Sequence, residues 1–185
     1  MRSLRTALAV LAVVAVPAGA VAVPAAATAG TSASCPAGWG SLSEAMNRST
    51  TAVLTNVRTG RHSCFDRVVF DISGKPPGYT VRYASEVFYT HTNRPMPLRG
   101  GAQLEFAIDG NEVDATGRPA FQPPNELEVA DVTGYRTLRQ VASGGSAEGF
   151  TVFGIGVRAR LPFRVFTLAG PGSGSRLVID IAHRW

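Results

Sequence analysis

Hydrophobic and polar residues alternate along much of the chain with a period of two, which places successive side chains on opposite faces of a β-strand. The clearest case is residues 67–72 (RVVFDI), which put Val68, Phe70 and Ile72 on one face. The same pattern returns at residues 176–181 (RLVIDI), again with arginine first, aspartate fifth and isoleucine last. We therefore predict two equivalent strands, one early and one terminal, in a mainly β domain.

The repeat also predicts how its two copies pair. If they pair antiparallel and in register, Arg67 lies opposite Asp180 and Asp71 lies opposite Arg176. Opposite charges facing each other across strands stabilise a sheet by about 0.2–1 kcal/mol. We favour this structural interpretation; the alternative is that the arginines form a polar face that binds a ligand.

Other segments alternate in the same way between turn signals. We predict strands over residues 51–58, 79–83, 103–109, 136–141, 150–157 and 163–168, in addition to the two repeats. Many short strands of this kind indicate a β-sandwich or an open barrel of about seven to nine strands. Helix is expected only as one turn at residues 43–47 and a short piece at 143–149 or 156–161.

Two stretches between the strands are interpreted as connections. Residues 59–66 (TGRHSCFD) predict a turn, and residues 110–126 form a long irregular loop. Long irregular loops in compact domains often carry function or mobility.

The N-terminal residues have the pattern of a secretory signal peptide. Arg2 and Arg5 precede an apolar run at residues 7–23, and small residues in A-x-A-like sites follow. An uncleaved anchor is the weaker alternative, because a spanning helix needs about 20 clean apolar residues and Pro17 and Gly19 interrupt this run. We therefore expect an exported protein, either secreted or associated with the cell envelope.

This interpretation divides the chain into three parts. Residues 1–29 are the predicted signal peptide, residues 30–50 an extended lead-in, and residues 51–185 the β domain. No later stretch is long enough to span a membrane, so no membrane contact is expected after cleavage. Lipid attachment at Cys35 is a third possibility, although the residues before it resemble a lipobox poorly.

The chain has two cysteines, Cys35 and Cys64. In an exported protein we interpret them as one disulfide. It would close a loop of about 30 residues and contribute about 3–4 kcal/mol of stability. A reactive thiol or a metal pair is the alternative, and it lacks neighbouring ligands in the sequence.

The charge pattern argues against nucleic-acid binding. The chain has 18 basic and 13 acidic residues and a formal net charge of +5, and Lys75 is the only lysine. The arginines are spread along the chain among acidic residues, with no basic block. Arginine suits bidentate contacts with carboxylates and phosphates.

Catalytic motifs are missing from the sequence. It has no G-x-S-x-G and no H-E-x-x-H, and the three histidines (His62, His91, His183) belong to no paired motif. Residues 154–159 fit G-x-G-x-x-A, but the helix of a dinucleotide-binding unit does not follow, so the glycines predict a bulge or close packing.

Two groups of carboxylates have residue types that suit catalysis or metal binding. Glu126 with Glu128, or Asp109 with Glu112 and Asp114, have the chemistry of a glycosidase or calcium site. We favour a solvated loop. No metal, no cofactor and no enzymatic activity are expected, and a hydrolase with an unrecognised site remains the least favoured hypothesis.

Three stretches resemble the AMIN-like domain proteins of actinobacteria: residues 35–41 (CPAGWGS), 59–74 (TGRHSCFDRVVFDISG) and 153–183 (FGIGVRARLPFRVFTLAGPGSGSRLVIDIAH). The resemblance implies an exported or lipid-anchored envelope protein. AMIN domains are β-sandwiches of two similar sheets that accompany amidases and secretins and are implicated in targeting to peptidoglycan. No amidase or secretin motif occurs here, so no catalytic cargo is expected.

These observations predict a non-enzymatic domain that binds a cell-wall glycan, in particular peptidoglycan. The alternative is a protein–protein module that recruits or regulates an envelope hydrolase. Our candidate ligand-binding residues are Arg61, His62, Asp66 and Arg67, in and beside the predicted turn. Glycan binding also needs exposed aromatic rings, for which the candidates are Tyr79, Tyr83, Phe88, Tyr89, Phe121, Tyr135 and Trp185.

Overall fold

The computed structural model describes residue 35 and residues 38–185, and all regular structure in that part of the chain is β-strand. The predicted signal peptide lies outside the described residues. The strands are β1 (Glu44–Met46), β2 (Val53–Arg61), β3 (Phe65–Ser73), β4 (Tyr79–Ala84), β5 (Ala102–Asp109), β6 (Leu138–Ala147), β7 (Phe150–Val157), β8 (Phe163–Ala169) and β9 (Ser175–Ala182). In these residues no helix has the length and hydropathy to cross a membrane.

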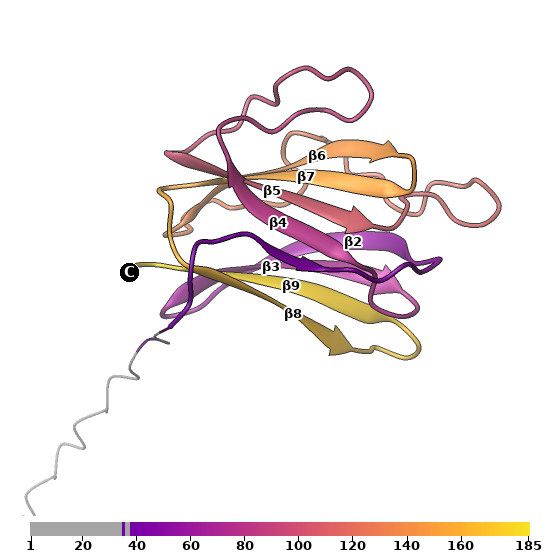
Figure 1. Cartoon of the computed structure of the whole chain (residues 1–185), viewed down its shortest axis with the longest axis horizontal. Helices are drawn as coiled ribbons and strands as arrows, with labels where there is room; N and C mark the ends of the chain where they lie inside the picture. The colour runs from indigo at the N-terminus through magenta and orange to yellow at the C-terminus, as the bar shows by residue number, and fades with distance from the viewer. Residues whose placement is uncertain (1–34, 36–37) are drawn as a thin grey trace, which may run out of the picture. The chain divides into compact units, whose positions relative to one another are not determined.

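The strands form two antiparallel sheets stacked as a sandwich (Figure 1). One sheet has the order β1-β4-β5-β7-β6 and the other β2-β3-β9-β8. Between them, Phe70 of β3 packs against Phe106 of β5 and Phe153 of β7, with ring centroids 4.8 Å apart in both pairs. The predicted β-sandwich is confirmed.

The two repeats are β3 and β9, and they pair in the predicted register. Arg67 lies opposite Asp180, and Asp71 lies opposite Arg176. Arg67 Nε donates to Asp180 Oδ1 at 2.6 Å. Asp180 is fully buried and also binds Arg164 of β8, at 2.7 Å. The predicted pairing of Arg67 with Asp180 is therefore confirmed.

The second predicted pair faces across the strands without an ion pair between its members. Asp71 instead accepts from Arg58 of β2, with Nε 2.8 Å from Oδ2. The Arg176 guanidinium donates to the Ala169 carbonyl at 2.8 Å. Register alone did not determine the partner, because Arg58 reaches Asp71 from the other neighbouring strand.

A double-mutant cycle on Arg67→Ala and Asp180→Ala should give a coupling energy of about 1–2 kcal/mol, because the bond joins a buried carboxylate to a guanidinium. Urea unfolding of the two single variants and the double variant measures it. The exposed pair Arg82–Glu105 is the matched control, with an expected coupling of about 0.2–1 kcal/mol. Additive effects of Arg67→Ala and Asp180→Ala would contradict the pairing.

The helical predictions are wrong. Residues 44–46 form β1, in which Glu44 pairs with Val81 of β4. Residues 143–147 belong to β6, and β7 continues to Val157. Pairing with a neighbouring strand satisfies the backbone N–H and C=O groups that face it, and this tertiary gain outweighs weak local helix signals.

The boundaries around the predicted turn also differ. β2 runs to Arg61 and β3 begins at Phe65, so the connection is shorter than the predicted turn at 59–66. β1 lies within the segment predicted to be a lead-in, and its pairing with β4 makes it part of the larger sheet.

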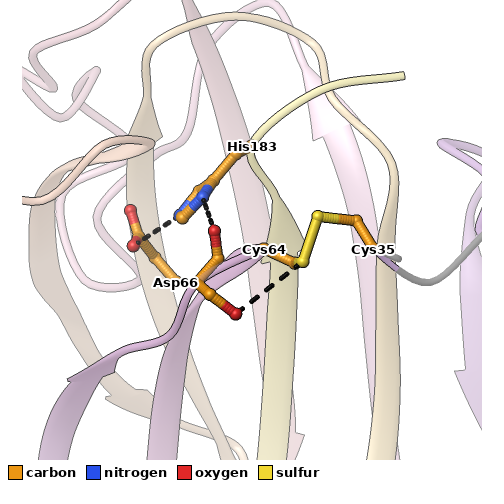
Figure 2. Close-up of a disulfide and its surroundings, with 5 residues drawn as sticks. Cys35, Cys64, Asp66 and His183 are labelled. Carbon is orange, nitrogen blue, oxygen red and sulfur yellow. Dashed lines mark hydrogen bonds and ion pairs between the residues drawn. A yellow bond between two sulfur atoms is a disulfide. The ribbon is translucent and has the colours of Figure 1, made fainter. Parts of the chain in front are cut away.

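The predicted disulfide between Cys35 and Cys64 is present (Figure 2). It ties residue 35 to the residue just before β3. The Cys64 carbonyl also accepts a hydrogen bond from the His183 amide at 2.9 Å. The N-terminal segment, the start of β3 and the end of β9 therefore meet at one point.

Candidate functional site

The four predicted ligand-binding residues do not gather on one surface. Arg61 and His62 are exposed at the β2–β3 turn. The His62 ring stacks on Phe65 with centroids 4.4 Å apart, and the Arg61 guanidinium lies 5.8 Å from the ring centroid of Tyr135. Both side chains are therefore accessible to a binding partner from solution.

Asp66 is inside the protein, with 1% of its surface exposed. One carboxylate oxygen accepts from the backbone N–H groups of Thr137 at 2.6 Å and Leu138 at 3.1 Å. The other lies 2.9 Å from Nε2 of His183, and Figure 2 shows the two side chains pointing toward each other. This geometry makes Asp66 a link between β3, the start of β6 and the C-terminal segment.

His183 completes that link. Its Nδ1 lies 3.2 Å from the Ser63 carbonyl oxygen, and its Nε2 faces the Asp66 carboxylate. Both partners are hydrogen-bond acceptors, so a ring N–H on either side of His183 has an acceptor to which it can donate. The side chain is thereby held by the backbone beside the disulfide.

Arg67 lies on the outer face of the four-stranded sheet, beside Arg164. Both guanidinium groups bind Asp180 and pack over aromatic rings: Arg67 lies 5.3 Å from the centroid of Phe65, and Arg164 lies 4.5 Å from that of Trp39. Phe166 contacts both arginines. We call this half-buried cluster the arginine–aromatic face: Trp39, Phe65, Arg67, Arg164 and Phe166.

A separate cleft of about 870 Å³ opens beside β6. Three segments line it, from residues 89–97, 112–126 and 144–146. We call it the loop cleft. The long loop predicted from the sequence at residues 110–126 supplies one of its sides.

Backbone hydrogen bonds fix the first of these segments. Tyr89 N–H donates to the Arg94 carbonyl at 3.0 Å, and Met96 N–H donates to the Val87 carbonyl at 2.7 Å. Thr90 N–H donates to the Gly144 carbonyl at 3.0 Å, which attaches the segment to β6. The segment therefore resembles a short hairpin that is hydrogen-bonded to β6 of the larger sheet.

The glycines of the G-x-G-x-x-A run allow residues 96–99 to pack closely against β7. A Cβ atom on Gly156 would lie 2.0 Å from the Arg99 carbonyl oxygen, and one on Gly154 would lie 2.7 Å from the Met96 sulfur. Only glycine permits residues 96–99 to pack against β7 at these distances. The prediction that these glycines mark close packing is confirmed.

Gln140 joins two segments that border the cleft. It is buried, its Oε1 accepts from the Arg99 N–H at 2.8 Å, and its Nε2 donates to the Leu127 carbonyl at 2.9 Å. The Arg99 guanidinium also pairs with the Glu128 carboxylate. Sequence reasoning missed Gln140, because a single glutamine in a predicted strand carries no motif.

Carboxylates supply the negative charge of the loop cleft. Burial raises the pKa of the Glu112 carboxyl above its ordinary value, hydrogen bonds from Ser143 and Ser146 oppose this shift, and the charge of Glu126 adds to it. Ser143 Oγ donates to Glu112 at 3.1 Å. Glu112 is half-buried and Glu126 is exposed. The two belong to different carboxylate groups of the sequence prediction, and the prediction of a solvated loop fits Glu126 but not Glu112.

The aromatic candidates fall into separate groups. Tyr79 and Phe121 are core residues, each with 8% of its surface exposed. The Tyr83 hydroxyl donates to the Leu161 carbonyl at 2.7 Å. Tyr89 lines the loop cleft, and Trp185 is exposed elsewhere. Among the described residues, no group of three or more histidine, cysteine or acidic side chains is arranged to hold a metal ion.

The AMIN-like domain model matches residues 52–183. The chain belongs to the AMIN-like domain family. AMIN-like domains are associated with the cell envelope. The matched range of this AMIN-like domain includes β2 to β9, all three segments of the loop cleft and the four candidate residues of the β2–β3 region. No curated protein matches the sequence.

Proposed function

We propose that this AMIN-like domain is an exported, non-enzymatic protein of an actinobacterial envelope that binds peptidoglycan or another wall glycan in the loop cleft. One observation carries the proposal: the cleft has a volume of about 870 Å³. Ligand-binding clefts commonly have volumes of about 300–1,000 Å³, with an apolar lining and a few polar groups that orient the ligand.

The lining of the loop cleft suits a sugar chain. Tyr89, Pro95, Pro97 and Val113 offer apolar surface for the C–H faces of sugar rings, and Val113 is 43% exposed. The acidic side chains and Ser146 provide acceptors and a donor for hydroxyl groups. Tyr89 is the aromatic candidate from the sequence that lies at this site.

Replacing Tyr89 with alanine should weaken binding to purified peptidoglycan about tenfold, because a central aromatic contact is a typical binding hot spot. Co-sedimentation of the oxidised protein with peptidoglycan, at low and high salt, measures this. Binding that persists at high salt supports a specific site, since salt screens contacts between exposed charges.

Phe150→Ala is the matched control, because Phe150 is also a partly exposed aromatic residue (50%) and does not line the cleft. Its binding should equal that of the unchanged protein. Loss of binding in Phe150→Ala but not in Tyr89→Ala would place the ligand outside the loop cleft. Release of soluble fragments from the peptidoglycan would contradict a non-enzymatic role.

The arginine–aromatic face supports a second candidate function, a protein–protein module that recruits or regulates an envelope hydrolase. Tryptophan and arginine are enriched at binding hot spots, and Trp39 and Arg164 lie together on this face. The exposed Arg61 and His62 are candidates for the same contact, His62 through its stacking on Phe65. Affinity capture from envelope extracts, repeated with Trp39→Ala, separates this function from glycan binding.

A further inference from the structure

The carboxylates of this protein differ in how their charge is compensated. Arginine forms an ion pair with each of four of them: Asp71, Glu105, Glu128 and Asp180. Glu112 and Glu126 of the loop cleft have no such pair with any residue that the structure describes, although Arg94 lines the same cleft.

Burial makes the negative charge of Glu112 costly, because no arginine of the described residues pairs with it. An exposed carboxylate such as Glu86 is compensated by water, whereas Glu112 is half-buried and has lost part of its hydration. The negative charge of Glu126 raises the pKa of Glu112 further, and the interaction with His91 lowers it. A cation placed here gains more than one at an open surface, because Coulomb attraction strengthens as the local dielectric constant falls.

The other residues that line the cleft indicate the chemistry of the rest of the ligand, to which the cationic group is attached. Tyr89, Pro95 and Pro97 give apolar surface beside the acidic pair. A bare metal ion would make no use of this surface, whereas a charged group on an organic body would. A primary ammonium group has three N–H donors and bridges two carboxylates, with an oxygen of Ser146 within the same lining.

We infer that the loop cleft recognises a primary ammonium group of its ligand through Glu112 and Glu126, while Tyr89 and the prolines hold the adjoining part of the ligand. This inference rests on the proposed function and narrows it to amine-bearing wall material. Two sources share that chemistry: an amino sugar without its acetyl group, and the free side-chain amine of a diamino acid in a stem peptide.

The test compares each amine with its acetylated form, using the oxidised protein and isothermal titration calorimetry. The first arm uses the glucosamine tetramer against the N-acetylglucosamine tetramer. The second uses the peptide Ala-Glu-Lys against the same peptide with an acetylated lysine side chain. In at least one arm the free amine should bind tenfold tighter or more, as expected for a charged hydrogen bond, and that arm identifies the source.

Variants then assign the preference to the acidic pair. Glu112→Gln keeps the shape of the side chain and should reduce the preference for the free amine to less than about twofold. Glu126→Gln should reduce it in the same direction. Glu86→Gln is the control, since Glu86 is exposed and does not line the cleft, and it should leave the preference unchanged. Thermal unfolding confirms that each variant is folded.

The outcomes separate this inference from the proposed function. Equal binding, or no binding, of the free and acetylated forms in both arms overturns ammonium recognition, and the proposed function stands as long as the protein sediments with peptidoglycan. A preference that survives both Glu112→Gln and Glu126→Gln also overturns it. If the protein neither sediments with peptidoglycan nor binds any probe, the proposed function fails as well.

Discussion

Replacing Asp66 with alanine is expected to lower the free energy of unfolding by about 3–5 kcal/mol. The change leaves the backbone N–H groups of Thr137 and Leu138 without their acceptor in a buried place, and removes the partner of His183. Each unsatisfied buried donor costs about 1–3 kcal/mol. Urea unfolding, followed by circular dichroism, measures the change.

Asp66→Asn distinguishes the hydrogen bonds from the charge. Its carbonyl oxygen can still accept from Thr137 and Leu138, so its loss of stability should be smaller than that of Asp66→Ala. Glu86→Ala, at an exposed acidic position, should change stability by less than about 0.5 kcal/mol. A stable Asp66→Ala variant that no longer binds peptidoglycan would make Asp66 a ligand-binding residue, as the sequence first suggested.

Removing the disulfide with Cys35→Ala and Cys64→Ala together should lower the free energy of unfolding by about 3–4 kcal/mol. The two cysteines are 29 residues apart, and the chain between them contains β1 and β2. Without the bond, the unfolded chain gains the conformational freedom of that loop. Urea unfolding of the unchanged oxidised protein and of the double variant gives the difference.

Reduction provides the control for this prediction. A reductant should destabilise the unchanged protein to about the level of the double variant and should not affect the double variant itself. The described residues include no free cysteine, so no other thiol contributes. Equal stability of the oxidised protein and the double variant would show that the bond does not constrain folding.

The central part of the fold could be predicted from the sequence because one rule governs it. Alternation in residues 67–72 and 176–181 assigns inward and outward side chains, and equal lengths with matching charges fix the register of β3 against β9. The same rule, extended two residues backward from Val68, puts Asp66 on the inward face. Asp66 was interpreted as a surface residue only because residues 59–66 were assigned to a turn.

The loop cleft could not be predicted in this way. Its lining comes from residues 89–97, 112–126 and 144–146, which lie far apart in the sequence and carry no common period. Their arrangement depends on tertiary contacts, such as the two hydrogen bonds of Gln140 and the close approach at Gly156. Likewise, β1 is too short for alternation to identify it, and pairing with β4 stabilises it.

The position of β9 has a consequence for the order of events during biosynthesis. β9 follows every other strand in the chain, yet it lies inside the four-stranded sheet, between β3 and β8 (Figure 1). A polypeptide that emerges N-terminus first delivers this strand last, so β3 and β8 wait unpaired on their facing edges until then. The pairing of β3 with β9 joins segments that are far apart in the sequence, and such pairs form slowly, so we expect the four-stranded sheet to close only after the strands before β9 have been synthesised.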